Sequence, residues 1–252
     1  MKMKALLDKF SDTQNHIEDI TLIKSDQISN VYFCVFNGIK AVIKEDKPYA
    51  KKIGLNRKRE ASLLNAISHS CSCPNIIFND LKAGLIIWEY IEGGEAESKL
   101  ILNKDFLIKL GRKVKNIHIP YTKTLSSYSF LDSIEHYKNI VKDNKSVEDI
   151  NNLISKLFNS DTQLTLCHND LTKPNILVGD TISFIDWEYA SLNDPHYDIA
   201  TIFQAFNLNA NQRDAFLIGY NSANINLARV SQFIALTKLT DRLWGSAIDT
   251  FT

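Results

Sequence analysis

The chain changes character at a pair of glycines, Gly93-Gly94, and this change constrains the fold more than any other feature. Before the pair, runs rich in β-branched and aromatic residues predict strands at 20–23, 31–36 and 39–44. Asn37-Gly38 separates the last two runs and favours a type I′ hairpin turn, in which both central residues need a positive φ. A helical pattern at 60–67 and two further strands near 75–78 and 84–90 complete this part.

After the glycine pair, the spacing of apolar residues becomes helical. Helices are expected at 103–118, 130–143 and 146–159 and over most of 195–248, with short strands at 164–167, 176–178 and 182–185. The sequence therefore predicts a two-lobed α+β fold. A small β-rich N-terminal lobe with one main helix would occupy residues 1–92, and a larger, mainly helical C-terminal lobe residues 93–252, with a hinge near 90–95.

Charge and apolar content exclude several classes of protein. The 252 residues carry 29 Lys and Arg against 29 Asp and Glu, and a net charge of zero is atypical of nucleic-acid-binding proteins. No apolar run approaches the roughly 20 residues that a membrane span needs. The neutral total hides an asymmetry, because the basic excess lies in residues 1–160 and the acidic excess in residues 161–252. The oligomeric state cannot be inferred from these features.

The cysteines and the N-terminal sequence favour a cytoplasmic protein. The four cysteines have the spacing of neither a disulfide framework nor a zinc knuckle; they are Cys34, Cys71, Cys73 and Cys167. Residues 1–10 are amphipathic and lack the apolar core of a secretory signal. We therefore expect reduced thiols in the cytoplasm.

The segment from Leu166 to Ala190 carries the chemistry. Asp170 and Asn175 stand as D-x-x-x-x-N, and Asp186 follows eleven residues after Asn175, at the end of an apolar strand. Two short strands split by Gly179-Asp180 predict a hairpin that brings Asn175 and Asp186 to the same end of a small sheet. Phosphoryl transfer needs such a set: one carboxylate at the acceptor hydroxyl, and an amide and a second carboxylate for Mg²⁺.

The sequence over 166–200 resembles the choline/ethanolamine kinase and aminoglycoside phosphotransferase family, which has a protein-kinase-like fold. The stretch from His168 to Leu177 is similar to its catalytic loop. Ile185-Asp-Trp-Glu-Tyr-Ala190, followed by Asn193-Asp194 and Asp198-Ile-Ala200, is similar to its choline-kinase signature. The resemblance implies a phosphotransferase that uses ATP and Mg²⁺ to phosphorylate an alcohol. Asp170 would be the catalytic base, Asn175 and Asp186 the Mg²⁺ ligands and members of the catalytic set, and His168 would brace the loop.

The same resemblance implies a nucleotide site in the N-terminal lobe. Lys44, in Ala41-Val-Ile-Lys44, would contact the phosphates and pair with Glu60 of the following helix. The turn from Lys24 to Asn30 has no glycine, so Ser29 and Asn30 would bind phosphate through their side chains. Glu89 and Ile91, at the end of the last strand of that lobe, complete the expected nucleotide contacts. Asp-Phe-Gly and Ala-Pro-Glu motifs are missing, which argues against a protein substrate.

Aromatic and acidic residues downstream of Asp186 predict the acceptor site. Cation–π contacts and a nearby carboxylate suit an organic cation, and the expected substrate-binding residues are Trp187, Glu188, Tyr189, Tyr197 and Trp244. The resemblance implies choline or ethanolamine as acceptor, although Ala247 stands where choline kinases have a second tryptophan. Thiamine kinase, aminoglycoside phosphotransferase and, outside this class, a nucleotide-binding pseudokinase module are the alternatives.

Overall fold

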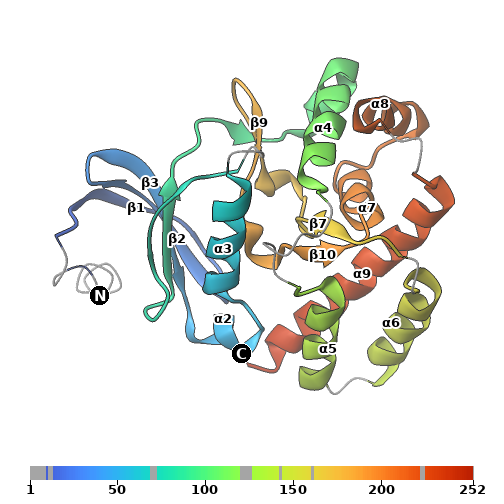
Figure 1. Ribbon diagram of the computed structural model, residues 1–252, viewed down its shortest axis with the longest axis horizontal. Coiled ribbons are helices and arrows are strands. Elements are labelled where there is room, and N and C mark those ends of the chain that lie inside the picture. The colour runs from blue at the N-terminus through green and yellow to red at the C-terminus, as the bar shows by residue number, and fades with distance from the viewer. Residues whose placement is uncertain are drawn as a thin grey trace.

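The computed structural model describes residues 10, 14–68, 73–119, 127–141, 144–159, 162–221 and 225–251. Cys71 and most of the N-terminal stretch lie outside these residues, whereas Cys34, Cys73 and Cys167 are free thiols. A β-sheet occupies one end of the molecule and a group of helices the other (Figure 1), so the predicted α+β arrangement is confirmed. The domain boundary at 92/93 stays a prediction.

Five antiparallel strands form the N-terminal sheet in the order β1-β2-β3-β5-β4. They are β1 (Ile17–Ser25), β2 (Ser29–Phe36), β3 (Ile39–Asp46), β4 (Ile76–Asp80) and β5 (Leu85–Glu89). Asn37 and Gly38 have φ values of 50° and 81°, which confirms the predicted hairpin turn. Because β3 lies in the middle of the sheet, its residue Lys44 is fixed between β2 and β5.

Two helices lie between β3 and β4 in the chain: α2 (Pro48–Lys52) and α3 (Arg57–Ile67). The Asn56 side chain accepts a hydrogen bond from the backbone N–H of Arg59 at 3.0 Å and so caps the start of α3. One face of α3 is buried, and that face includes Glu60 and Arg57. The helix packs against the residues Trp187–Tyr189 that follow Asp186, and its buried charged side chains face them.

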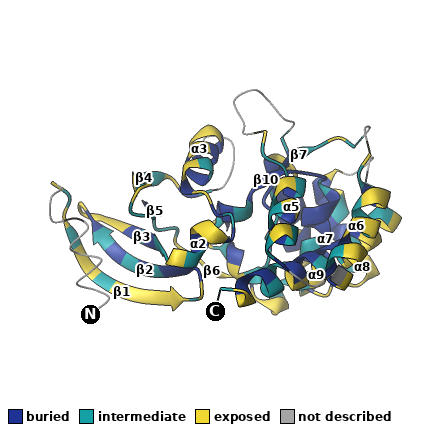
Figure 2. Ribbon diagram, turned by 90° about the horizontal axis from the view of Figure 1, so that it is seen from below, coloured by how far each residue is buried: buried dark blue, intermediate teal, exposed yellow. Residues whose placement is uncertain are grey.

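Helices make up most of the C-terminal region. They are α4 (Lys104–Ile117), α5 (Phe130–Ile140), α6 (Asn144–Leu157), α7 (His196–Ala205), α8 (Ala210–Tyr220) and α9 (Leu227–Asp249). Figure 1 shows α9 crossing this part of the molecule, and Figure 2 shows that α7 is largely buried. A Cβ at Gly219 of α8 would lie 1.8 Å from the carbonyl oxygen of Ile108, so glycine is required where α8 crosses α4.

Short strands and 3₁₀ turns form much of the segment from Thr165 to Asn193, which contains the predicted catalytic residues. β6 (Gly94–Glu95), β8 (Ile176–Val178) and β9 (Ile182–Phe184) form one small sheet, and β7 (Thr165–Cys167) pairs with β10 (Ser191–Asn193). The 3₁₀ turns are η1 (Ser98–Leu102), η2 (Lys173–Asn175) and η3 (Trp187–Tyr189). These elements agree with the strands expected at 164–167, 176–178 and 182–185.

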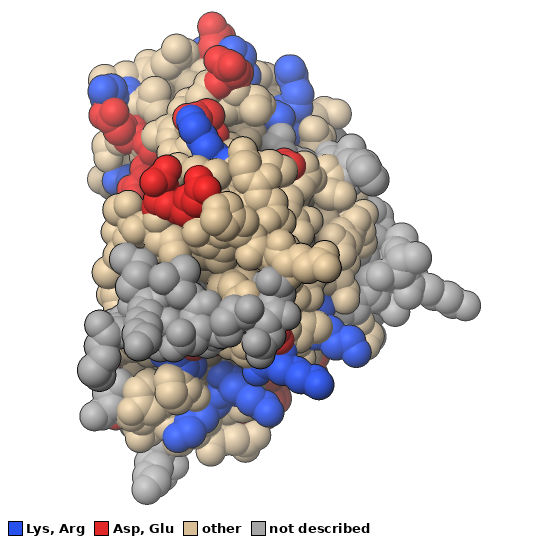
Figure 3. Space-filling view, turned by 90° about the vertical axis from the view of Figure 1, so that its left-hand side faces the viewer, with Lys and Arg blue, Asp and Glu red and all other residues tan. Residues whose placement is uncertain are grey.

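On the face that Figure 3 shows, basic side chains gather near the bottom of the view, and acidic and basic side chains stand close together near the top. Among the described helices, none is both long enough and apolar enough to cross a bilayer.

Candidate active site

The β8–β9 hairpin brings the predicted catalytic residues together. The backbone N–H of Ile185 donates to the carbonyl of Asn175 at 3.0 Å, which joins the two ends of the hairpin. The Asn175 amide nitrogen donates to the Asp170 carboxylate at 2.7 Å and to its backbone carbonyl at 2.9 Å. Asp170, Asn175 and Asp186 therefore lie at one end of the small sheet, as the sequence predicted.

A buried histidine and a buried aspartate hold the catalytic loop. The His168 ring donates from Nε2 to the carbonyl of Ile185 at 2.9 Å. The carboxylate of Asp198 accepts the backbone N–H groups of His168 and Asn169, both at 2.8 Å. Burial lowers the pKa of His168, so the ring is neutral and serves as a brace.

The side-chain oxygens of Asn175 and Asp186 suit the coordination of a divalent cation. The two hydrogen bonds of Asn175 use its amide nitrogen, and no described residue donates to its Oδ1. Asp186 sits in the left-handed region at φ 65°, directly after β9, and its side chain is 25% exposed. Amide and carboxylate oxygens are the ligands that Mg²⁺ prefers. Asn175 and Asp186 are therefore suitable Mg²⁺ ligands.

Lys44 reaches the catalytic segment from the N-terminal sheet. Its ammonium lies 2.5 Å from Asp186 Oδ1 and 2.6 Å from Glu188 Oε2, and its side chain is 3% exposed. The predicted direct pair with Glu60 is wrong, because Glu60 binds the guanidinium of Arg57 at 2.5 Å instead. The buried arginine that pairs with Glu60 was not anticipated.

Arg57 connects three parts of the structure. Its guanidinium contacts Asp46 at the end of β3 at 2.5 Å, Glu60 on its own helix, and Glu188 in η3 at 3.1 Å. Buried charges need partners of the opposite sign. A chain of ion pairs through Arg57 and Glu188 therefore connects Glu60 to Lys44.

Burial and mutual repulsion set the ionisation of the carboxylates. Burial, together with the negative charges of Asp186 and Glu188, raises the pKa of Asp170 well above its ordinary value. Burial alone would also raise the pKa of Asp186, but the ammonium of Lys44 outweighs it and the net shift is downward. A cation bound beside these groups would favour the ionised form of Asp170.

One cavity, of about 530 Å³, lies on the side of Asp170 that faces the N-terminal lobe. It is lined by Lys24, Ser25, Asp26, Gln27, Ile28, Asp170, Asp186, Glu188, Tyr189 and Trp244. Ser29 and Asn30 are not among the lining residues. Ser29 is buried and donates to Asp26, and Asn30 donates to Glu45. The turn thus faces the cavity with residues 24–28, which corrects the expected positions.

Two of the expected nucleotide contacts, Glu89 and Ile91, lie at the end of β5 and just after it. Glu89 pairs with Ala41 of β3, and its carboxylate accepts a hydrogen bond from the Asn75 side chain at 3.0 Å. Ile91 follows β5 and is partly exposed. The backbone N–H of Tyr90, which lies between Glu89 and Ile91, donates a hydrogen bond to the carbonyl of Lys40. Nucleotide contacts by Glu89 and Ile91 stay a prediction.

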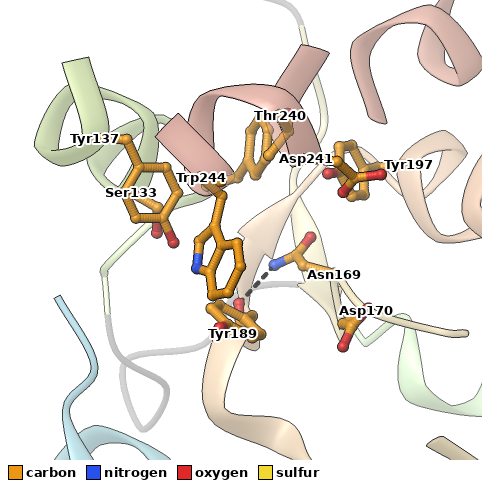
Figure 4. A pocket seen from close by; sticks show the side chains of 11 residues that line it. Ser133, Tyr137, Asn169, Asp170, Tyr189, Tyr197, Thr240, Asp241 and Trp244 are labelled. Atoms are coloured by element: carbon orange, nitrogen blue, oxygen red, sulfur yellow. Dashed lines mark hydrogen bonds between the residues drawn. The ribbon is translucent and has the colours of Figure 1, made fainter. Parts of the chain in front are cut away.

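A second cavity, of about 430 Å³, opens on the other side of Asp170. Its aromatic side chains come from α5, η3, α7 and α9 (Figure 4); they are Phe130, Tyr137, Tyr189, Tyr197 and Trp244. The rings of Tyr189 and Trp244 meet edge to face, with centroids 6.5 Å apart. The polar members are Ser133, Asn169, Asp170, Thr240 and Asp241.

Two residues that were expected to bind the acceptor lie elsewhere. Trp187 is 1% exposed, and its indole N–H donates to the carbonyl of Phe184, so it is part of the core. Glu188 forms ion pairs with Lys44 and Arg57 and lines the first cavity instead. Ala247 is fully buried and lines neither cavity.

Asp241 lines the second cavity and was not among the expected residues. It lies one helical turn before Trp244 in α9, and this i, i+3 spacing is the sequence signal that could have revealed it.

Known proteins resemble this chain in sequence. The sequence model of the choline/ethanolamine kinase family matches residues 49–235. The protein LicA of Haemophilus influenzae is 30% identical over 154 residues, which cover 56% of this chain and 45% of LicA. The first curated relatives are matched over about half of their length.

Solved structures show the same fold. Choline kinase LicA from Streptococcus pneumoniae superposes with a TM-score of 0.82 at 20% identity, over 98% of this chain and 91% of that one. A structure of LicA in complex with AMP gives 0.80 at 19% identity, over 98% and 89%. The streptomycin–ATP complex of APH(2")-IIa gives 0.69 at 17% identity, over 96% and 89%. The fold is therefore protein-kinase-like.

Proposed function

The chain belongs to the choline/ethanolamine kinase family, and we propose on that basis that it transfers the γ-phosphoryl group of ATP to the hydroxyl of a small cationic amino alcohol such as choline or ethanolamine. The observation that carries the proposal is the position of Asp170, which lines both cavities. A donor on one side and an acceptor on the other would meet at this carboxylate. An ATP-dependent reaction also fits the cytoplasmic location expected from the cysteines.

The charged cavity fits the nucleotide. A LicA structure contains AMP, and the polar lining beside Lys44 and Asp186 suits a phosphate chain with its cation. Lys44 would exchange its contact with Asp186 for one with the phosphates, which frees Asp186 as a ligand. Mg²⁺ held by Asn175 and Asp186 would neutralise charge on the transferring group.

The aromatic cavity fits the acceptor. Its rings offer π faces to a cation, and the Asp170 carboxylate can accept a hydrogen bond from the acceptor hydroxyl. Proton transfer to Asp170 would follow as the oxygen attacks the γ-phosphorus and the bond to the β-phosphate oxygen breaks. Because Lys44, Asp170, Asn175 and Asp186 are all present and assembled, an inactive pseudokinase is disfavoured.

A panel of acceptors tests the proposal. Release of ADP from ATP and Mg²⁺ would be measured with choline, ethanolamine, thiamine and an aminoglycoside, each beside an Asp170→Asn control. We expect acceptor-dependent release with choline or ethanolamine and none from the control. If thiamine or the aminoglycoside alone stimulates release, the proposed acceptor is wrong; if no acceptor does, so is the proposed activity.

A further inference from the structure

The acceptor cavity has a second carboxylate besides Asp170. Asp241 lies on α9, three residues before Trp244, so both side chains project from one face of that helix. Figure 4 shows Asp241 beside Tyr197 and on the same side of the cavity as Asp170. Among the described residues that line this cavity, these two are the only ones with a carboxyl group.

Asp241 has no protein partner in the described part of the chain. No described side chain or backbone group donates a hydrogen bond to its carboxylate, and no Lys, Arg or His there forms an ion pair with it. The residue is open to the water of the cavity. Partial burial nevertheless raises the pKa of Asp241, and its charge contributes to the raised pKa of Asp170. The charge of Asp241 therefore acts on Asp170 across the cavity.

Filling the cavity would change the surroundings of Asp241. An acceptor seated against Trp244 and Tyr197 would displace water from the carboxylate, and a carboxylate that loses water needs new hydrogen-bond donors. A protonated primary, secondary or tertiary amine supplies both a positive charge and at least one N–H. A quaternary ammonium supplies the charge alone, because its methyl groups cover the nitrogen.

We infer that Asp241 is the specificity-determining residue of the acceptor site and selects an amino alcohol whose ammonium carries N–H groups over a quaternary one. This inference rests on the proposed function and narrows its acceptor. The ammonium would donate to Asp241 while the hydroxyl of the same molecule donates to Asp170. The aromatic walls bind either kind of cation, so the preference comes from the carboxylate.

The test is a methylation series of one acceptor. Values of kcat/KM would be measured for ethanolamine, its N-methyl and N,N-dimethyl forms, and choline, with wild type, Asp241→Asn and Asp249→Asn. Asp249 is a matched control because it is an exposed aspartate near the end of the same helix and lines neither cavity. Thermal unfolding and ADP binding of each variant would verify that it is folded.

In wild type and Asp249→Asn, we expect kcat/KM to be highest for ethanolamine and lowest for choline. Asp241→Asn should lower the value for ethanolamine about tenfold or more, the effect of a charge-assisted hydrogen bond, and change the value for choline much less. An equal loss for both acceptors, or a wild type that prefers choline, would overturn the inference and leave the proposed function intact. No turnover of any amine by wild type would instead overturn the proposed function.

Discussion

The two cavities that meet at Asp170 differ in how they are built. The cavity toward the N-terminal lobe is lined by charged and polar groups, among them Asp186 and Glu188, which are bound to Lys44. The other cavity is walled by aromatic rings from four separate elements. One side is thus suited to a polyanion with its metal ion, and the other to an organic cation.

This difference reflects two ways of holding a side chain in place. On the charged side, ion pairs fix the groups: Arg57 links β3, α3 and η3 through Asp46, Glu60 and Glu188. On the aromatic side, helix packing fixes them, as when Tyr197 packs between Phe130 of α5 and Phe233 of α9. Substitutions on the charged side should therefore change the rate of phosphoryl transfer. Substitutions on the aromatic side should change packing or the affinity for the acceptor.

The largest expected effect is at the junction itself. Asp170→Asn keeps the shape of the side chain but removes the group that accepts the hydroxyl proton, so kcat should fall by about three to four orders of magnitude. Affinity for ADP should stay within about threefold of wild type, because Lys44 and Asp186 are untouched. Turnover measured by ADP release and binding by calorimetry check both parts; undiminished turnover would exclude Asp170 as the base.

Trp187 and Trp244 should differ in how much they contribute to stability. Trp187 is fully buried, so Trp187→Ala should lower the free energy of unfolding by about 3–5 kcal/mol. Trp244 lines both cavities and is partly exposed, so Trp244→Ala should cost no more than about 1.5 kcal/mol. Urea unfolding of both variants measures the contrast. Similar losses in the two would mean that Trp244 also belongs to the core.

A buried ion pair holds together two of the helices that line the acceptor cavity, α7 and α9. Asp194 accepts from Arg229 at 2.6 Å and contacts His196 at 2.5 Å, and so joins the starts of α7 and α9. Asp194→Asn should lower the free energy of unfolding at neutral pH by about 2–3 kcal/mol.

The pH dependence of that loss has a definite sign. Burial would raise the pKa of Asp194, but hydrogen bonds from His196 and Arg229 outweigh it and lower the pKa below 3.8. The stabilisation is therefore complete above the ordinary carboxyl pKa and is lost as pH falls through the lowered value. Wild type and Asp194→Asn should converge in stability in that acidic range, which denaturation at several pH values would reveal; a constant difference would contradict the assignment.

Local pattern in the sequence was enough to predict the charged side in outline. The hairpin that joins Asn175 to Asp186 is made of neighbours in the chain, and strand periodicity places Lys44 in β3. The wrong partner for Lys44 has a physical reason. Arg57 and Glu60 lie one turn apart on α3, and a sequence does not reveal that the guanidinium pairs with Glu60 and also with Glu188, the carboxylate that binds the ammonium.

The aromatic side was harder to predict because its residues are distant in the chain. Phe130, Tyr137 and Trp244 meet only after α5 and α9 have packed, and their spacing in the sequence carries no trace of that. Trp187 follows Asp186 directly, but η3 turns its indole into the core. Asp241 was accessible in principle through its helical spacing from Trp244.

The most direct test of the central claim is a pair of kinetic measurements on two variants. For Lys44→Met and Tyr137→Ala, KM would be determined separately for ATP and for the amino alcohol that wild type turns over best; Tyr137 lines the aromatic cavity and not the charged one. We predict that Lys44→Met raises KM for ATP about tenfold or more, with little change for the acceptor, and that Tyr137→Ala does the reverse. If both variants raised both constants equally, the two cavities would not bind separate substrates.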